Sequence, residues 1–119
     1  MDKNDKEMIE LFRAVGVREL ESIKLNKAFL PGANSLEARQ FAFTKTEVLK
    51  FAETDKSKIM VVKTIIPIKI LDILEFSDDV DPNIFKNGVI TVQPEKQDLF
   101  NKAIISIEFL ERIDEFNGI

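Results

Sequence analysis

The sequence contains no cysteine and no histidine, and its ten phenylalanines are accompanied by neither tyrosine nor tryptophan. Without cysteine there is no disulfide framework, thiolate metal site or cysteine nucleophile. Without histidine the chain lacks the commonest general base and the commonest transition-metal ligand. Ser-His-Asp hydrolases, zinc hydrolases and histidine-dependent ribonucleases of the usual kinds are therefore excluded. Phenylalanine offers apolar area and a π face without a hydrogen-bonding group, so we expect most of these rings in the core.

Basic residues are too few for a nucleic-acid surface. The chain has 17 Lys and Arg against 21 Asp and Glu, a net charge of −4, and no Lys/Arg cluster stands out, so we expect no nucleic-acid partner. No stretch approaches the ~18 consecutive apolar residues of a membrane span. The opening "MDKNDKEMIE" is too polar for a signal peptide. We therefore expect no membrane association and a cytoplasmic location, reached by delivery if the chain is a toxin module.

The length of 119 residues suits one domain,. We expect a polar lead-in over residues 1–10 and a single domain over 11–119. Hydrophobic periodicity and turn residues give the order β-α-β-α-β-α-β-β, which predicts an α+β fold with curved mixed sheets and short helices. The predicted strands cover residues 11–15, 40–44, 59–68, 89–93 and 104–113, and the predicted helices cover 17–27, 68–76 and a segment that begins at Thr44. Residues 94–103 are predicted to form a polar helical turn. Thr44 and Glu47 have the spacing of a capping box, Asn87-Gly88 is a turn signature, and the predicted strand over 59–68 is rich in β-branched residues,.

An arginine interrupts the first predicted strand. Side chains alternate between the two faces of a strand, so Arg13 shares a face with Leu11 and Val15,. Arg13 therefore either lies on a solvated strand surface, paired with a carboxylate, or points into a cleft where a guanidinium can hold a ligand.

Four segments, taken in order over about residues 11 to 110, carry a family resemblance. They are "LFRAV" with "VRELESI", "FLPGANSLEARQFAFT" with "EVLKFA", "VVKTIIPIKIL", and "GVITVQPEKQDLFNKAIISIEFL". This layout resembles the small ADP-ribosyltransferase-like domains found as toxin modules of Rhs and other polymorphic toxins, and as stand-alone bacterial or phage proteins. The resemblance implies an ADP-ribosyltransferase-like fold that holds NAD⁺, as substrate and without a metal, in a cleft between two small sheets.

The same resemblance implies roles for individual residues. Arg13 matches the first-strand arginine that holds the phosphates of the dinucleotide, and a guanidinium suits a bidentate phosphate grip. Phe41 or Phe43 would stack on the nicotinamide, and Thr44 or Ser35 would supply a hydroxyl to the pocket. Each has an alternative: phenylalanines at alternating strand positions pack in cores, and Thr44 already has a role as a helix cap.

The catalytic carboxylate is the weakest match to the family. Gln93 and Glu95 have the spacing of the family's Gln/Glu-x-Glu pair, so Glu95 is the candidate that would stabilise the oxocarbenium-like state of the ribose. Pro94 between them departs from the pattern, and Glu108 on the last predicted strand is a second candidate. The histidine-type branch is excluded because the chain has neither His nor Tyr.

Two functions follow from these observations. The first is an ADP-ribosyltransferase or NAD⁺ glycohydrolase, acting as a toxin effector with a target or a cognate immunity protein. The second is a non-catalytic protein of the immunity or phage counter-defence type that binds a protein partner or a nucleotide-derived ligand. In that case the acidic stretch "EFSDDVD" would face a basic partner or would simply be a solvated loop,. The sequence leaves the oligomeric state and the completeness of the chain open.

Overall fold

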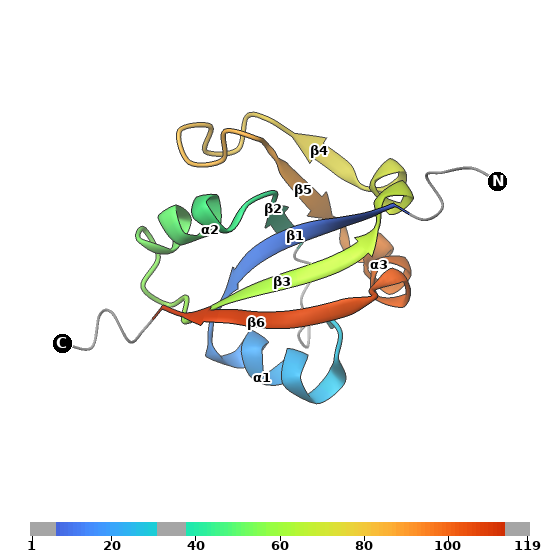
Figure 1. Cartoon of the computed structure of the whole chain (residues 1–119), viewed down its shortest axis with the longest axis horizontal. Coiled ribbons are helices and arrows are strands. Elements are labelled where there is room, and N and C mark those ends of the chain that lie inside the picture. Colours follow the sequence, from blue (N-terminus) through green and yellow to red (C-terminus); the bar gives the residue numbers. More distant parts are fainter. Residues whose placement is uncertain (1–6, 31–37, 114–119) are drawn as a thin grey trace.

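The computed structural model describes residues 7–30 and 38–113, and it is an α+β domain built on one sheet (Figure 1). The elements follow one another as β1 (Met8–Val15), α1 (Val17–Asn26), β2 (Arg39–Ala42), α2 (Lys45–Ala52), β3 (Met60–Pro67), the 3₁₀ helix η2 (Ile68–Ile73), β4 (Glu75–Ser77), β5 (Val89–Val92), the 3₁₀ helix η3 (Pro94–Lys96), α3 (Gln97–Ala103) and β6 (Ser106–Arg112). The α+β class predicted from the sequence is confirmed.

The sheet has six strands in the order β4-β5-β2-β1-β3-β6, and every neighbouring pair is antiparallel. The prediction of mixed sheets was wrong. The connection from β1 to β2 shows the reason: Arg39, at the start of β2, lies 3.1 Å from Glu19, at the start of α1. The chain therefore returns to the end where β1 finishes before β2 begins, and the two strands run in opposite directions. A helix between two strands does not by itself make them parallel.

Element boundaries differ from the prediction at two places. The first strand begins at Met8 rather than at Leu11, because residues 8–10 also pair with β3, with Met8 opposite Pro67. The short edge strand β4, Glu75–Ser77, lies where a helix end and an acidic loop were expected. It pairs with β5, the buried four-residue strand of sequence "VITV".

Helices cover both faces of the sheet. On one face α1 and α3 pack against β1, β2 and β3, and this larger core includes the three rings of Phe29, Phe41 and Phe100. On the other face α2 and the segment between β4 and β5 pack against β1 and β3 through Val48 and Phe85. Alternation along β1 explains the division, because Leu11 and Val15 point into the first core while Phe12 and Ala14 point into the second,.

The number of backbone-paired positions differs greatly between neighbouring strands of the sheet. β1 and β3 pair at eight successive positions, whereas β1 and β2 pair only at Phe12 and Ala42. A regular ladder would continue through Arg13 with Phe41, but those backbones are not paired,. The sheet therefore consists of a β1-β3-β6 half and a β4-β5-β2 half that meet at one point, and Figure 1 shows the short strands of the second half beside the long strands of the first.

Two local predictions near the second core are confirmed. Thr44 is the N-cap of α2: its hydroxyl accepts a hydrogen bond from the Glu47 backbone N–H at 3.2 Å and donates to Glu47 Oε1 at 2.6 Å. The Asn87-Gly88 turn leads into β5, and Gly88 has a φ of +84°, with the Phe76 ring so close that a Cβ at this position would clash with it. Glycine is needed there for both reasons.

Replacing Thr44 with alanine is expected to lower the free energy of unfolding by about 1 kcal/mol, because the first turn of α2 loses the oxygen that satisfies its N–H. Equilibrium urea denaturation measures the loss. Thr54→Ala is the matched control: that hydroxyl donates to the Phe51 carbonyl at the exposed end of the same helix, so a smaller change is expected. Equal losses of unfolding free energy in the two variants would contradict the stabilising role of the Thr44 cap.

Candidate ligand-binding cleft

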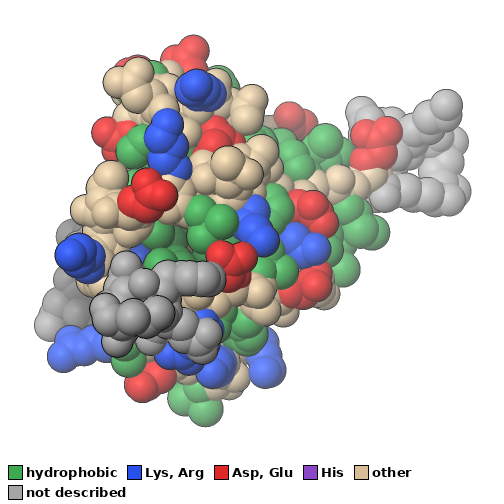
Figure 2. All heavy atoms as spheres, turned by 60° about the vertical axis from the view of Figure 1, so that its left-hand side comes forward, with side chains coloured by type: hydrophobic (Ala, Val, Ile, Leu, Met, Phe, Trp, Pro, Cys, Tyr) green, Lys and Arg blue, Asp and Glu red, His purple; other side chains and the backbone are tan. Residues whose placement is uncertain are grey.

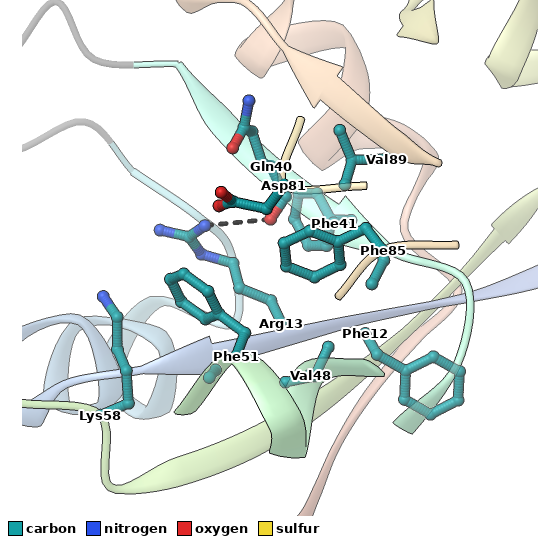
Figure 3. A pocket seen from close by; sticks show the side chains of 12 residues that line it. Phe12, Arg13, Gln40, Phe41, Val48, Phe51, Lys58, Asp81, Phe85 and Val89 are labelled. Carbon is teal, nitrogen blue, oxygen red and sulfur yellow. Dashed lines mark hydrogen bonds between the residues drawn. The ribbon is translucent and has the colours of Figure 1, made fainter. Parts of the chain in front are cut away.

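A cleft opens where the two halves of the sheet separate (Figure 3). Its volume is about 100 Å³, smaller than the roughly 300 to 1,000 Å³ of pockets that enclose a whole drug-sized ligand. It can therefore enclose one ring or one group of a larger ligand. The residues that line it are Phe12, Arg13 and Ala14 of β1, Gln40, Phe41 and Ala42 of β2, Val48 and Phe51 of α2, Val89 of β5, and Lys58, Asp81 and Phe85 from the connecting segments.

Arg13 lies in the wall of this cleft and is held on three sides. Its Nε and Nη2 donate to the two carboxylate oxygens of Glu19 at 2.7 and 2.9 Å. Its Nη1 donates to the Gln40 carbonyl at 3.0 Å, so the side chain links β1 to β2 where backbone pairing has stopped. The guanidinium also lies 5.9 Å from the centre of the Phe41 ring. Arg13 thus lines a cleft, as one alternative drawn from the sequence has it, and is also paired with a carboxylate, as the other has it.

A second arginine completes a buried charge network. Arg39 Nε lies 3.1 Å from the same Glu19 oxygen that Arg13 contacts. Arg39 also donates to Gln97 Oε1 at 2.9 Å and to the Leu30 carbonyl at 2.7 Å. The three charged side chains are only 14 to 18% exposed. We call Arg13, Glu19 and Arg39 the Arg-Glu-Arg clasp, because it joins one strand of each sheet half through α1.

Burial would raise the pKa of Glu19, but this effect is outweighed by the hydrogen bonds and positive charges of Arg13 and Arg39, which hold the pKa below its ordinary value. Glu19 is therefore ionised at neutral pH, and the clasp carries one net positive charge. A charge of that sign beside the cleft favours an anionic group on a ligand.

The rim of the cleft carries three further polar groups. Lys58 is held only loosely, 3.9 Å from the half-exposed Asp55 carboxylate. The Asp81 side chain is exposed, and within the described residues no hydrogen bond or ion pair reaches its carboxylate. Gln40 extends from β2 beside Asp81 (Figure 3). The cleft therefore offers two cations, one carboxylate and one amide to a ligand.

Aromatic rings form the apolar side of the cleft. Phe51 and Phe85 pack against each other with ring centres 5.6 Å apart, a separation that leaves no room for a third ring between them. A planar group can therefore stack on the outer face of this pair but cannot be sandwiched by it. Phe51 is half-buried, while Phe85 is almost fully buried.

The residues proposed from the sequence do not all meet at this cleft. Arg13 and Phe41 both line it, but Phe41 is only 1% exposed and packs on Phe29 and Phe100 at 5.2 and 5.1 Å. Phe43 packs on Phe76, 6.3 Å away, and borders a separate shallow groove beside β1. Thr44 caps α2, and Ser35 lies outside the described residues.

Neither candidate catalytic carboxylate lines the cleft. Glu95 is exposed in η3, beyond the end of β5, and Gln93 donates to Glu75 at 3.0 Å. Glu108 lies on the edge strand β6 and pairs with Lys63 at 3.1 Å. Among the residues described, Asp81 is the carboxylate that shares the cleft with Arg13.

Sequence reasoning missed Glu19, Lys58 and Asp81. Glu19 had no signal beyond being an acidic residue in the first turn of a helix. Lys58 and Asp81 lie in the polar connecting segments "ETDKSK" and "SDDVDPN", whose composition indicates only a turn and an acidic loop. Only the three-dimensional course of those segments brings them to one place.

No group of three or more potential metal ligands is found among residues 7–30 and 38–113. No helix in the same ranges is long and apolar enough to span a membrane. No family model, curated protein or solved structure matches the chain.

Proposed function

We propose that the chain is an ADP-ribosyltransferase-like domain that binds NAD⁺ or a related nucleotide in the cleft between its two sheet halves. One observation carries the proposal: an arginine of the first strand lines a cleft at the split of the sheet, beside a second cation and an aromatic wall. This is the placement that the family resemblance implies for Arg13. The fold assignment at this finer level rests on the same correspondence.

The chemistry of the cleft suits a nucleotide. Lys58 and the remaining Nη1–H and Nη2–H of Arg13 can donate to phosphate oxygens, while the half-buried Phe51 offers a ring face to a base,. A longer nucleic acid is a poorer match. On the face drawn in Figure 2, basic and acidic side chains are interspersed, and the described residues form no continuous basic patch there.

The position of Glu95 favours binding over turnover. A carboxylate stabilises an oxocarbenium-like ribose only when it is fixed against the sugar, and Glu95 is exposed outside the cleft lining. We therefore propose a ligand-binding role in the first place. The toxin-effector role requires in addition that nicotinamide be released from NAD⁺.

Calorimetric titration with NAD⁺ tests the proposal. We expect saturable binding to the wild-type protein and about tenfold weaker binding to Lys58→Ala, since ~1.4 kcal/mol is typical of one lost charge-assisted hydrogen bond. Lys58 is a better probe than Arg13, because among the described residues its ammonium contacts only the Asp55 carboxylate, at 3.9 Å. Its removal is therefore expected to leave the fold intact. Lys56→Ala is the matched control: Lys56 is exposed two residues away and does not line the cleft.

Absence of binding heat with NAD⁺, ADP-ribose and AMP would overturn the proposal. An equal loss of NAD⁺ affinity in Lys56→Ala and Lys58→Ala would show that the effect comes from the overall charge of the protein. Chromatography of the titrated samples detects free nicotinamide. Release that persists in wild type and disappears in Glu95→Gln would restore the enzyme hypothesis with Glu95 as its catalytic residue.

A protein partner is the second candidate function, and the β4 edge favours it. Glu75, Asp78, Asp79 and Asp81 are all exposed there, and the Phe76 ring on the same edge is 59% exposed. An apolar ring surrounded by carboxylates fits a basic partner with an apolar anchor point. This role, of the immunity or counter-defence type, is the one to pursue if no nucleotide binds.

A further inference from the structure

Asp81 is an unusual residue in its backbone as well as in its position. Its φ of 40° lies in the left-handed region, which aspartate tolerates better than most residues but still occupies rarely,. Its carbonyl accepts hydrogen bonds from the N–H groups of Ile84 and Phe85 at 2.8 and 2.9 Å. The turn is therefore locked to the residue whose ring forms the aromatic wall. Strained backbone that persists in a tightly determined turn is a pointer to function.

The Asp81 carboxylate stands in the cleft with its acceptor capacity unused by the described residues (Figure 3). A carboxylate accepts hydrogen bonds and repels phosphate, so it cannot belong to the phosphate-binding side of the cleft. The group of a nucleotide that offers donors without charge is the ribose, through its 2′- and 3′-hydroxyls. A carboxylate that bonds a ribose 2′-hydroxyl also discriminates against a 2′-phosphate.

The charges in the cleft decide which half of NAD⁺ enters it. The nicotinamide ring carries a positive charge, and the cleft wall already holds Arg13 and Lys58. Adenine is neutral and can stack on the outer face of Phe51, the half-buried ring of the Phe51–Phe85 pair,. The small volume, about 100 Å³, admits one such ring, so the ribose and the phosphates would lie at the rim, where Asp81 and Lys58 stand.

We infer that the cleft binds the adenosine half of a ribonucleotide, with Asp81 accepting hydrogen bonds from the ribose hydroxyls and rejecting a 2′-phosphate. This inference rests on the proposed nucleotide-binding function and assigns to Asp81 the choice between NAD⁺ and NADP⁺. Asp81 is a specificity-determining residue: it contacts the ligand and excludes the phosphorylated form.

The test is a pair of calorimetric titrations, with NAD⁺ and NADP⁺, on wild type, Asp81→Asn and Asp79→Asn. Asparagine keeps the shape of the side chain and tolerates the left-handed conformation, so the turn is preserved while the charge is removed. Wild type is expected to bind NAD⁺ at least tenfold more tightly than NADP⁺. In Asp81→Asn that ratio is expected to fall by about tenfold, whereas Asp79→Asn, exposed in the same loop and outside the cleft lining, keeps the wild-type ratio.

A wild-type protein that binds NAD⁺ and NADP⁺ equally would overturn the inference and leave the proposed function standing. An unchanged ratio of NAD⁺ to NADP⁺ affinity in Asp81→Asn would also overturn the inference alone. So would an equal fall of the ratio in Asp79→Asn, because the effect would then come from the charge of the loop. A wild-type protein that binds neither dinucleotide would overturn this inference, and if ADP-ribose and AMP also gave no binding heat, the proposed function would be overturned with it.

Discussion

Phe41→Ala is expected to remove about 3 to 5 kcal/mol of stability, as the truncation of a fully buried ring does. The side chain is 1% exposed and meets the rings of Phe29 and Phe100 at 5.2 and 5.1 Å. A domain of this size has a total stability of about 5 to 15 kcal/mol, so the loss is a large part of it. Urea denaturation measures the change, with Phe41→Leu as a milder variant if the alanine form does not fold.

Phe43→Ala is the matched control for this prediction. Phe43 is half-buried directly after the same strand and packs on Phe76 at 6.3 Å, so a loss of about 1 to 2 kcal/mol is expected from its partial burial. If Phe41→Ala were tolerated while NAD⁺ binding vanished, Phe41 would be a ligand-stacking ring, as the family resemblance implies, and its role in the core would be secondary.

Glu19→Gln is expected to lower the free energy of unfolding by about 2 to 3 kcal/mol at pH 7, a little below the 3 to 5 kcal/mol of a fully buried pair because the clasp is partly exposed. The variant leaves Arg13 and Arg39 facing each other across the cleft end of the sheet without their shared counter-ion. Glu21→Gln, exposed on the same helix, is the control and should change stability by less than about 0.5 kcal/mol.

The cost of Glu19→Gln should depend on pH, because the clasp holds the pKa of Glu19 below its ordinary value against the opposing effect of burial. A carboxyl whose folded-state pKa is lowered stabilises the protein above its unfolded-state pKa, roughly 4.3, and this stabilisation is lost as the pH falls through the folded-state pKa. The difference between wild type and Glu19→Gln should therefore be constant from pH 7 to about 5 and shrink below that. A difference that is independent of pH from 7 to 3 would contradict an ionised Glu19 in the clasp.

The clasp also changes what Arg13→Ala can be expected to show. From the sequence alone, a phosphate-gripping Arg13 predicts lost NAD⁺ affinity with an intact fold. In the structure the same guanidinium satisfies both oxygens of Glu19, so its removal leaves a partly buried carboxylate with Arg39 alone. Loss of affinity in Arg13→Ala would then be inseparable from loss of stability, which is why Lys58 is the residue chosen to test ligand binding.

Local signals predicted the fold well where the residues concerned are near in sequence. The Thr44–Glu47 cap, the Asn87-Gly88 turn and the β-branched run of β3 each depend on a few adjacent side chains, and all three are found as expected. The direction of β2 could not be predicted in this way. It depends on where the segment after α1 returns the chain, and a periodicity pattern contains no information about that.

The candidate site was predictable only in part, for a similar reason. Arg13 stood out because a charged residue interrupts a hydrophobic strand, and it does line a cleft. Phe41 was equally consistent with core and with ligand stacking, and its burial favours the core. Lys58 and Asp81 come from different turns, 23 positions apart in the numbering, and polar residues in turns give no sign of which ones will meet.

The single paired position between β1 and β2 has a consequence for how the domain opens. Eight paired positions hold β1 to β3 and six hold β3 to β6. We therefore expect these three strands to unfold as one cooperative unit, with amide protons that exchange only on global unfolding. The β4-β5-β2 unit is anchored to them by one backbone pair and by side chains. Unfolding of the β4-β5-β2 unit alone should cost less free energy than unfolding of the whole domain. It would expose one whole wall of the cleft while the other wall stays folded.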